Sequence, residues 1–404
     1  MNASEGWCGV QGHPDVVVAG AGVIGAACAE ALSAAGLRVA VVDRGAPASG
    51  TTAAGEGNVL VSDKEPGPEL ELAKTSRRLW PELLAGLAEE IGPQAAEAEW
   101  EPKGGLVVAT GGESAAPLAG FASAQRGAGV RAEEIAPEAA FALEPHLTRA
   151  VTAAVHYPDD AQLQPVLAAA ALLAAVRARG GEVRPGTAAL GVERTAAGGV
   201  AGLRTDAGTI PCGAVVNACG PWSGEFSAAA GAPVDVRPRR GMVLVTAPLP
   251  PGTVRRKVYD ADYVGAVASD GADLQTSTVV ESTRAGTVLI GSSRQRAGFD
   301  DTVRVDVLRA VAAKAAALFP VLARVPVMRA YGGFRPYAPD HLPVIGPDPR
   351  LPGLWHATGH EGAGIGLAAA TGRLLADLFT GASPVVDPAP FRADRPALTA
   401  GAVL

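Results

Sequence analysis

The order of apolar and polar residues predicts a strand–helix–strand unit near the start of the chain. Residues 15–19 form a short run rich in valine, which is typical of a strand buried on both faces. Residues 26–35 carry apolar side chains at helical spacing, Gly36 ends this helix, and residues 37–42 form a second apolar run. An ordinary βαβ unit without any ligand would show the same pattern, so the residues of the first turn decide between the two readings.

Three glycines occupy that first turn with the spacing G-x-G-x-x-G, at Gly20, Gly22 and Gly25. The first allows a tight turn, the second lets the backbone approach a pyrophosphate, and the third lets the helix pack close to the strand. Free amides at the positive end of the helix attract phosphate. Asp43 ends the second strand, where a carboxylate accepts hydrogen bonds from ribose hydroxyls. We therefore predict a dinucleotide site here.

The loop after Asp43 has the composition of a segment that approaches a ligand closely. It carries small, hydroxyl or amide residues at Ser49, Thr51, Thr52, Gly55, Gly57 and Asn58. A flexible surface loop is the alternative. We prefer a cofactor contact, because the loop leaves the carboxyl end of a Rossmann-type strand.

The pattern changes twice along the chain. Residues 68–87, 113–129, 133–147 and 166–179 are predicted to be helical, with a polar connector at 155–165. Between residues 234 and 331 strand-like runs dominate, beside one helix at 303–319, which predicts an inserted antiparallel sheet. The end returns to the first pattern, with a strand at 354–357, a glycine-rich turn at 358–366 and a helix at 367–378.

These changes predict an α/β chain (α+β overall) made of a Rossmann-like cofactor domain and an inserted antiparallel-sheet substrate domain. The cofactor domain is expected to be discontinuous, comprising residues 14–90, 150–230 and 331–381. The substrate domain is expected to comprise residues 91–149 and 231–330. Residues 1–13 are expected to be a loose leader and residues 382–404 a tail.

Composition narrows the function further. The chain has 404 residues with a net charge of −7 and no basic cluster, which argues against a nucleic acid partner. Its longest apolar run, 166–176, is too short to span a bilayer, and the first 13 residues do not resemble a signal peptide. The four cysteines form no C-x-x-C pair and the histidines show no metal-ligand spacing, so we expect a cytoplasmic protein without a metal site.

With both ends considered, the chain resembles the FAD-dependent amine oxidoreductases of the D-amino-acid oxidase (DAO) family. The resemblance extends to glycine oxidase and to the flavin subunits of D-hydroxyproline, opine and cyanide-forming glycine dehydrogenases. It rests on AGAGVIGAA with Asp43, SGTTAAGEGN, VVNACGPWS, GGFRPYAPDHLPVIGP and ATGHEGAGIG, in this order over residues 14–381. It implies a glutathione-reductase-like fold and FAD as cofactor.

The resemblance also implies which residues hold FAD. Those near the pyrophosphate and ribose would be Gly20, Ala21, Gly22, Val23, Ile24, Gly25, Asp43, Arg44, Ser49, Thr51, Thr52, Gly55, Gly57 and Asn58. Those near the adenine and under the cofactor would be Val192, Ala218, Gly220 and Trp222. Those near the flavin would be Gly333, Arg335, Gly359, His360, Glu361, Gly362, Ala363, Gly364 and Ile365, with a helix N-terminus against the flavin edge that becomes negative on reduction.

Arg335, in GGFRP, matches the arginine that binds the substrate carboxylate in the amino-acid-oxidising members. A guanidinium offers a planar fork to a carboxylate and stays charged, although a surface salt bridge is the alternative. Tyr259, Tyr263 and Glu281 are further candidates for substrate contact, and Tyr263 and His360 for proton handling. For each of these four a purely structural role is an equal alternative.

The implied reaction is hydride transfer from the Cα of a D-amino acid, a glycine-like amine or a D-hydroxyproline-like imino acid to FAD, giving an imine. No cysteine precedes Pro339–Asp340, where sarcosine oxidases tether their flavin, so FAD is expected to be non-covalent. Leu289 stands where those oxidases carry an oxygen-activating lysine, which favours a dehydrogenase. The electron acceptor is O2 or a partner redox subunit.

Two alternatives stay open. One is an FAD-dependent 2-hydroxy-acid dehydrogenase, because an arginine clamp would serve that substrate too. The other is a flavin subunit active only within a hetero-oligomeric dehydrogenase.

Overall fold

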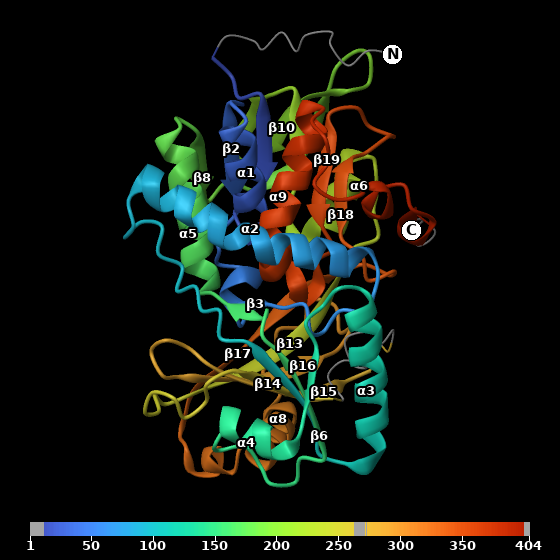
Figure 1. The fold of residues 1–404 in the computed structure, drawn as a ribbon. Coiled ribbons are helices and arrows are strands. Elements are labelled where there is room, and N and C mark those ends of the chain that lie inside the picture. Colours follow the sequence, from blue (N-terminus) through green and yellow to red (C-terminus); the bar gives the residue numbers. More distant parts are fainter. Residues whose placement is uncertain (1–11, 262–270, 272, 400–404) are drawn as a thin grey trace.

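The computed structural model describes residues 12–261, 271 and 273–399, which form two parts stacked on one another (Figure 1). One part is built on a six-stranded sheet and the other on an eight-stranded sheet. The chain passes between the two parts several times, so segments distant in sequence meet at their boundary (Figure 1).

The six-stranded sheet has the order β18-β19-β12-β1-β2-β8. Its strands are β1 (Val16–Ala19), β2 (Val39–Asp43), β8 (Glu182–Pro185), β12 (Ala214–Asn217), β18 (Val344–Pro347) and β19 (Leu354–Thr358). All neighbours are parallel except β18 and β19. Val16, Val17 and Val18 are completely buried, as the apolar run predicted.

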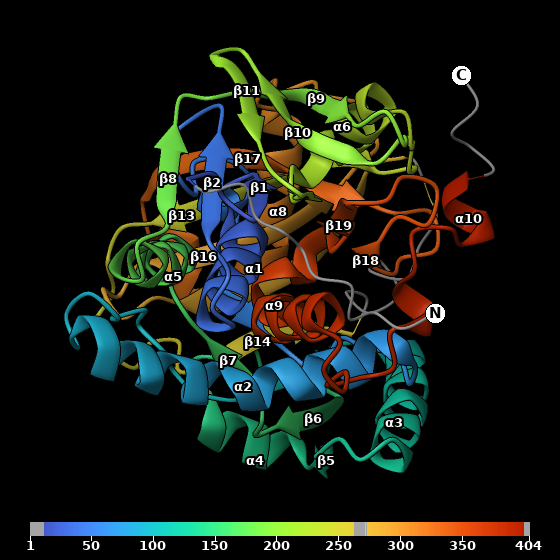
Figure 2. The same cartoon turned by 90° about the horizontal axis from the view of Figure 1, so that it is seen from above.

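Both faces of this sheet are covered. One face carries α1 (Val23–Ala34), α5 (Pro165–Ala178) and α9 (Gly364–Thr380), and α2 (Pro68–Ile91) lies across α5 and α9 (Figure 2). The other face carries a three-stranded sheet and a short helix, formed by β9 (Ala189–Arg194), β10 (Val200–Thr205), β11 (Gly208–Pro211) and α6 (Ser223–Ala230).

The eight-stranded sheet has the order β17-β13-β16-β15-β14-β4-β6-β5. Its strands are β4 (Gly105–Ala109), β5 (Glu133–Ile135), β6 (Ala153–Tyr157), β13 (Arg237–Thr246), β14 (Lys257–Asp260), β15 (Gln275–Ser282), β16 (Val288–Arg294) and β17 (Val327–Tyr337). Neighbours are antiparallel except β14 and β4, which are parallel. The helices beside it are α3 (Gly112–Gly127), α4 (Pro137–Leu143) and α8 (Val305–Leu318).

Short elements connect the two parts. They are the 3-10 helices η1 (Thr51–Ala54), η2 (Gly220–Trp222) and η4 (Glu361–Ala363), and the strand pair β3 (Asn58–Val59) and β7 (Ala161–Gln162). Each of these three 3-10 helices follows a strand of the six-stranded sheet and contacts β17 of the other part. A further 3-10 helix, η3 (Pro320–Arg324), packs against α8 within the eight-stranded part.

Three local predictions differ from the structure. The predicted polar connector at 155–165 contains most of β6 and all of β7, and β6 pairs with β4 although the predicted boundary placed it in the other part. The predicted helix at 133–147 is a short strand followed by α4, which begins at Pro137. The predicted tail is packed through 399, with η5 (Ala389–Phe391), α10 (Pro396–Thr399) and the buried side chains of Phe391 and Leu398.

No described helix is both long enough and apolar enough to cross a membrane.

Candidate functional site

Two cavities meet where the parts join. The central cavity is lined by segments from both parts: Gly22–Ile24, Thr51, Thr52, Ala54–Asn58, Ala218, Gly220, Gly241, Val243, Gly333, Arg335, Pro336, His360–Gly362, Gly364 and Ile365. The outer cavity extends along the six-stranded sheet and includes Asp43, Arg44, Ser49, Trp222 and Leu190. The two share Gly22, Thr51, Thr52, Ala218 and Gly220, so together they make one elongated site.

The turn between β1 and α1 leaves no room for side chains. Gly20 has a φ of 111°, and a Cβ there would lie 2.3 Å from the carbonyl oxygen of Ala218. A Cβ on Gly25 would lie 1.8 Å from the carbonyl oxygen of Gly20. Glycine at both positions therefore lets the start of α1 lie close to the ends of β1 and β12, where it faces the site.

Asp43 and Thr52 complete this turn. The Asp43 carboxylate accepts hydrogen bonds from the amides of Ala21 and Gly45, both at 2.8 Å. Each oxygen keeps further acceptor capacity toward the outer cavity, which Asp43 lines. The Thr52 hydroxyl accepts from the first helical amide, that of Val23, at 3.0 Å.

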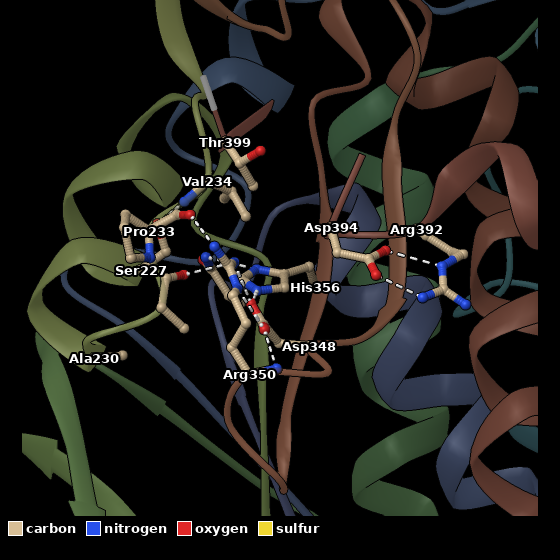
Figure 3. A network of polar contacts seen from close by, with 12 residues as sticks. Ser227, Ala230, Pro233, Val234, Asp348, Arg350, His356, Arg392, Asp394 and Thr399 are labelled. Atoms are coloured by element: carbon tan, nitrogen blue, oxygen red, sulfur yellow. Dashed lines mark hydrogen bonds and ion pairs between the residues drawn. The ribbon is translucent and has the colours of Figure 1, made fainter. Parts of the chain in front are cut away.

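A buried polar network lies under the turn after β12. Asn217 Nδ2 bonds the carbonyl of Ser223 at 3.1 Å and lies 3.3 Å from His356 Nδ1. His356 Nε2 lies 3.1 Å from Asp348, which also binds Arg350 (Figure 3). Arg350 and the His356 hydrogen bond hold the pKa of the Asp348 carboxyl well below its usual range, although burial acts in the opposite direction. The network fixes the segment from which Ala218 and Gly220 enter the site.

An aromatic surface closes the outer cavity. The Arg44 guanidinium lies 3.8 Å from the centre of the Trp222 ring, and the Phe299 ring stacks on Trp222 with 5.2 Å between the ring centres. Flat side chains at this end suit a planar ring such as adenine.

The turn before α9 closes the central cavity from the other end. Glu361 has a φ of 45°, and its carboxylate bonds Arg239 at 3.0 Å and His341 at 2.7 Å. His360 is buried, and its Nε2 lies 3.0 Å from the Thr371 hydroxyl. Burial lowers the pKa of His360 to about 3. The ring is therefore neutral near pH 7 and poorly suited to take a proton, so the structure favours the structural alternative for His360.

Arg335 enters the central cavity from β17. Its Nη1 donates to the carbonyl oxygen of Ser293 at 2.9 Å. A Cβ on Gly241 would lie 2.3 Å from this nitrogen, and a Cβ on Gly362 would lie 3.3 Å from Nε. Glycine at both positions thus leaves space for the guanidinium between β13 and the turn before α9.

Comparison with known proteins decides the family. Residues 15–378 match the family model "FAD dependent oxidoreductase" (DAO). The chain belongs to this family. It is 33% identical to glycine oxidase of Pseudomonas aeruginosa over 93% of this chain and 97% of the relative. It is 29% identical to hydrogen cyanide synthase subunit HcnC of the same species, over 94% and 96%. The crystal structure of glycine oxidase from Geobacillus kaustophilus superposes with a TM-score of 0.84 and 29% identity, covering 95% and 99% of the chains.

These findings confirm the predicted family, fold class and cofactor: the protein is an FAD-dependent oxidoreductase of the DAO family, and its chemistry is oxidation at CH–NH groups. The site suits FAD. The site extends from Asp43 and the Trp222 ring at one end to the N-terminus of α9 at the other. Glycine at position 22 keeps the wall between them open, because a Cβ there would lie 3.2 Å from the Thr52 hydroxyl.

Most of the predicted FAD contacts line one of the two cavities. Five do not: Ala21, Gly25, Val192, Gly359 and Ala363. Ala21 and Gly25 belong to the turn described above. The Ala21 amide donates to the Asp43 carboxylate, and Gly25 lies against the Gly20 carbonyl oxygen. Val192 is buried beneath the outer cavity with Leu203 and Phe226.

Two of the predicted substrate residues lie elsewhere. Tyr259 is completely buried and donates to the Ser62 hydroxyl, outside both cavities. Glu281 is completely buried, receives a hydrogen bond from Gln162 at 3.1 Å and lies 3.9 Å from the Lys257 ammonium. Both predictions of substrate contact are corrected, because each side chain is enclosed within the sheet. Tyr263 lies outside the described residues.

The prediction passed over several residues of the central cavity. Glu56, Gly241, Val243 and Pro336 all line it. Glu56 is part of the GEGN segment already assigned to the cofactor loop, and its charge between two glycines was the available clue. Gly241 and Val243 have no such clue, because only the pairing of β13 with β17 brings them to the site.

Proposed function

We propose that this protein holds FAD non-covalently and oxidises the Cα–N bond of an amino or imino acid whose carboxylate binds Arg335. The observation that carries the proposal is the position of the Arg335 guanidinium, in the cavity bounded by Gly241 and Gly362. A guanidinium held in this way presents a planar, permanently charged fork to a carboxylate. The similarity to glycine oxidases supports a small amino acid substrate.

Bound FAD would supply the oxidation, by accepting the hydride of the Cα–H bond while the substrate becomes an imine. The protein contributes position: Arg335 would fix the carboxylate and so the orientation of Cα. The start of α9 would favour negative charge at the adjoining end of the cavity.

The residue at one position favours a dehydrogenase over an oxidase. The family resemblance assigns Leu289 to the place where some oxidases have a lysine. Leu289 packs there with Val243, Val245 and Tyr331, so an aliphatic side chain stands where some oxidases carry a lysine. The similarity to HcnC, whose name describes a subunit, supports a second candidate, a flavin subunit that needs partner chains. The free cysteines Cys28, Cys212 and Cys219 support a cytoplasmic location.

An anaerobic absorbance titration tests the proposal. The FAD-loaded protein is mixed with D-amino acids, glycine, sarcosine, D-hydroxyproline and 2-hydroxy acids, and the flavin band is followed. We expect bleaching by a carboxylated amine and slow recovery in air. Bleaching by a 2-hydroxy acid alone would overturn the amine assignment, and rapid formation of hydrogen peroxide would overturn the dehydrogenase.

The Arg335 clamp is tested with the substrate so found. Arg335→Ala should lower the kcat/KM for flavin reduction by roughly 100-fold or more, because it removes charge-assisted hydrogen bonds worth about 1.5–3 kcal/mol each. Arg335→Lys should restore only part of the loss. Arg237→Ala is the matched control, since Arg237 pairs with Asp235 at the surface. An unchanged kcat/KM in Arg335→Ala, with FAD retained, would refute the clamp.

A further inference from the structure

Glu56 is an acidic residue in the wall of the central cavity. It lies between η1 and β3, and its Oε2 accepts a hydrogen bond from Asn58 Nδ2 at 3.3 Å. Its Oε1 is buried and has no hydrogen-bond partner within residues 12–261, 271 and 273–399. A buried carboxylate oxygen is costly unless a donor reaches it. This oxygen therefore has unused acceptor capacity in a residue that lines the cavity.

The sheet below leaves room for this carboxylate. A Cβ on Gly291 would lie 2.4 Å from Glu56 Oε1, so any larger residue would displace it. Gly291 lies on β16, which pairs with β13. On β13, Gly241 leaves room in the same way for the Arg335 guanidinium. Two adjacent strands thus each keep a glycine beneath a charged side chain, one anionic and one cationic.

A zwitterion is the ligand that matches this pair. An amino or imino acid carries a carboxylate and an ammonium on one carbon, so both of its charges can meet an opposite charge. A 2-hydroxy acid has no cation to offer Glu56 and would leave its charge unbalanced in the cavity.

We propose that Glu56 binds the ammonium group of the substrate through Oε1 while Arg335 binds its carboxylate. This inference rests on the proposed function, and it adds the residue that distinguishes amines from their hydroxy and deaminated analogues. Glu56 would contact the substrate directly, and Asn58 would position it through Oε2.

The charge of Glu56 has a second effect, on the pH profile. A carboxylate beside the bound ammonium stabilises its protonated form and so raises its pKa. The ammonium must lose a proton before the lone pair of its nitrogen can form the C=N bond of the imine. Removing the charge of Glu56 should therefore shift the pH profile of flavin reduction at saturating substrate toward lower pH.

The test compares two ligands in the FAD-loaded protein without oxygen. One is an amino acid that bleaches the flavin in the titration above, and the other is the same carboxylic acid without its amine, such as acetate for glycine. Binding of the second is read from the perturbed flavin spectrum. The variants are Glu56→Gln, Glu56→Asp and Arg335→Ala, with Glu101→Gln as a control for loss of a carboxylate outside the cavity.

In Glu56→Gln we expect the apparent Kd of the amino acid to rise roughly 10- to 100-fold, the size of a charge-assisted hydrogen bond. The Kd of the deaminated acid should stay unchanged or fall, and the pH profile should move down. Glu56→Asp should keep the wild-type pH profile, because its charge remains. Arg335→Ala should weaken both ligands.

Other outcomes would overturn the inference. Equal effects of Glu56→Gln on both ligands, or none, would show that Glu56 does not meet the amine. Loss of FAD from Glu56→Gln would assign the residue to the cofactor instead. These results leave the proposed function standing if the wild type is bleached by an amino acid. Absence of bleaching by every amine would sink the proposed function and this inference together.

Discussion

Asp160 is a completely buried carboxyl group that shapes the segment after the cofactor loop. One of its oxygens accepts hydrogen bonds from the amides of Val61 and Ser62, at 2.9 and 3.3 Å, and the other accepts from the Ser62 hydroxyl. Burial raises the pKa of Asp160 to about 7, although the Ser62 and Val61 hydrogen bonds lower it. Because an unfolded aspartate has a pKa of about 3.9, the folded chain holds the extra proton between roughly pH 4 and 7. The free energy of unfolding therefore falls as the pH rises through that window.

Replacing Asp160 with asparagine should flatten this dependence. Asparagine cannot ionise, so the loss of stability between pH 5 and 7.5 should shrink by an amount on the order of a few kcal/mol. Glu144, whose pKa burial also raises to about 7, would keep part of the slope. The measurement is the urea midpoint of the FAD-loaded protein at both pH values.

Asp394→Asn is the control for this experiment. The Arg392 guanidinium lowers the pKa of Asp394 below that of an ordinary aspartate, so this carboxyl group titrates outside the window. An Asp160→Asn variant with the wild-type slope would show that Asp160 is ionised in the folded protein.

Single residues of the site were predictable where chemistry alone restricts the residue type. A carboxylate clamp requires a guanidinium, and Arg335 lines the central cavity, while its contact with a substrate stays a prediction. Tyr259 and Glu281 are polar residues in apolar strands, and sequence gives no measure of how deeply such side chains are buried. Their enclosure depends on neighbours such as Ser62 and Lys257, which come from distant parts of the chain.

Among the elements, the join of β1 and α1 depends most strictly on glycine. Gly25 is helical, so alanine would ordinarily stabilise this position by about 1 kcal/mol. Here the methyl group would lie 1.8 Å from the Gly20 carbonyl oxygen and 3.3 Å from the Ala218 Cβ. Either α1 must move or the turn must open, and both changes displace the amides that face the cofactor.

Gly25→Ala should therefore lose FAD, read as the ratio of flavin to protein absorbance after gel filtration, and should lower the Tm. Gly120→Ala is the matched control, because Gly120 lies in α3 with nothing within 4 Å of its added Cβ. That control should keep FAD and gain about 0.5–1 kcal/mol of stability. Full FAD content in Gly25→Ala would contradict the packing described for this turn.

Elements built on repetitive patterns were predictable, and β17 was not. The helices α2, α5, α8 and α9 follow apolar stripes that sequence displays. In β17 the residues Gly332, Gly333 and Pro336 have poor strand propensity. A Cβ on Gly333 would lie 2.5 Å from the Ala54 Cβ, so contact with the cofactor loop overrides propensity at this position.

At the scale of the whole molecule, both parts line the candidate cofactor site. The loop at 51–58 and the turn at 360–364 come from one part, while Gly241, Val243 and Gly333 come from the other. Sequence motifs predicted that the first group lines a site. The second group depends on the register of β13 against β17, which a pattern of single residues does not encode.

FAD should therefore protect both parts from hydrogen exchange. Binding stabilises the folded state by about 2.7 kcal/mol when free FAD is 100 times its Kd. We expect slower exchange on FAD addition in residues 241–243 and 333–336 as well as in residues 20–25. Amides of α3, which does not line either cavity, should change only by the global effect. Protection confined to the six-stranded part would contradict a shared site.

The ladder between β13 and β17 also couples two crossings of the chain between the parts. The chain enters β13 at Arg237 and leaves β17 at Tyr337, and these two residues form the first pair of a ladder that continues without interruption to Val245–Arg329. Hydrogen bonds therefore hold the two crossings side by side, so a relative movement of the parts has to move both of them together.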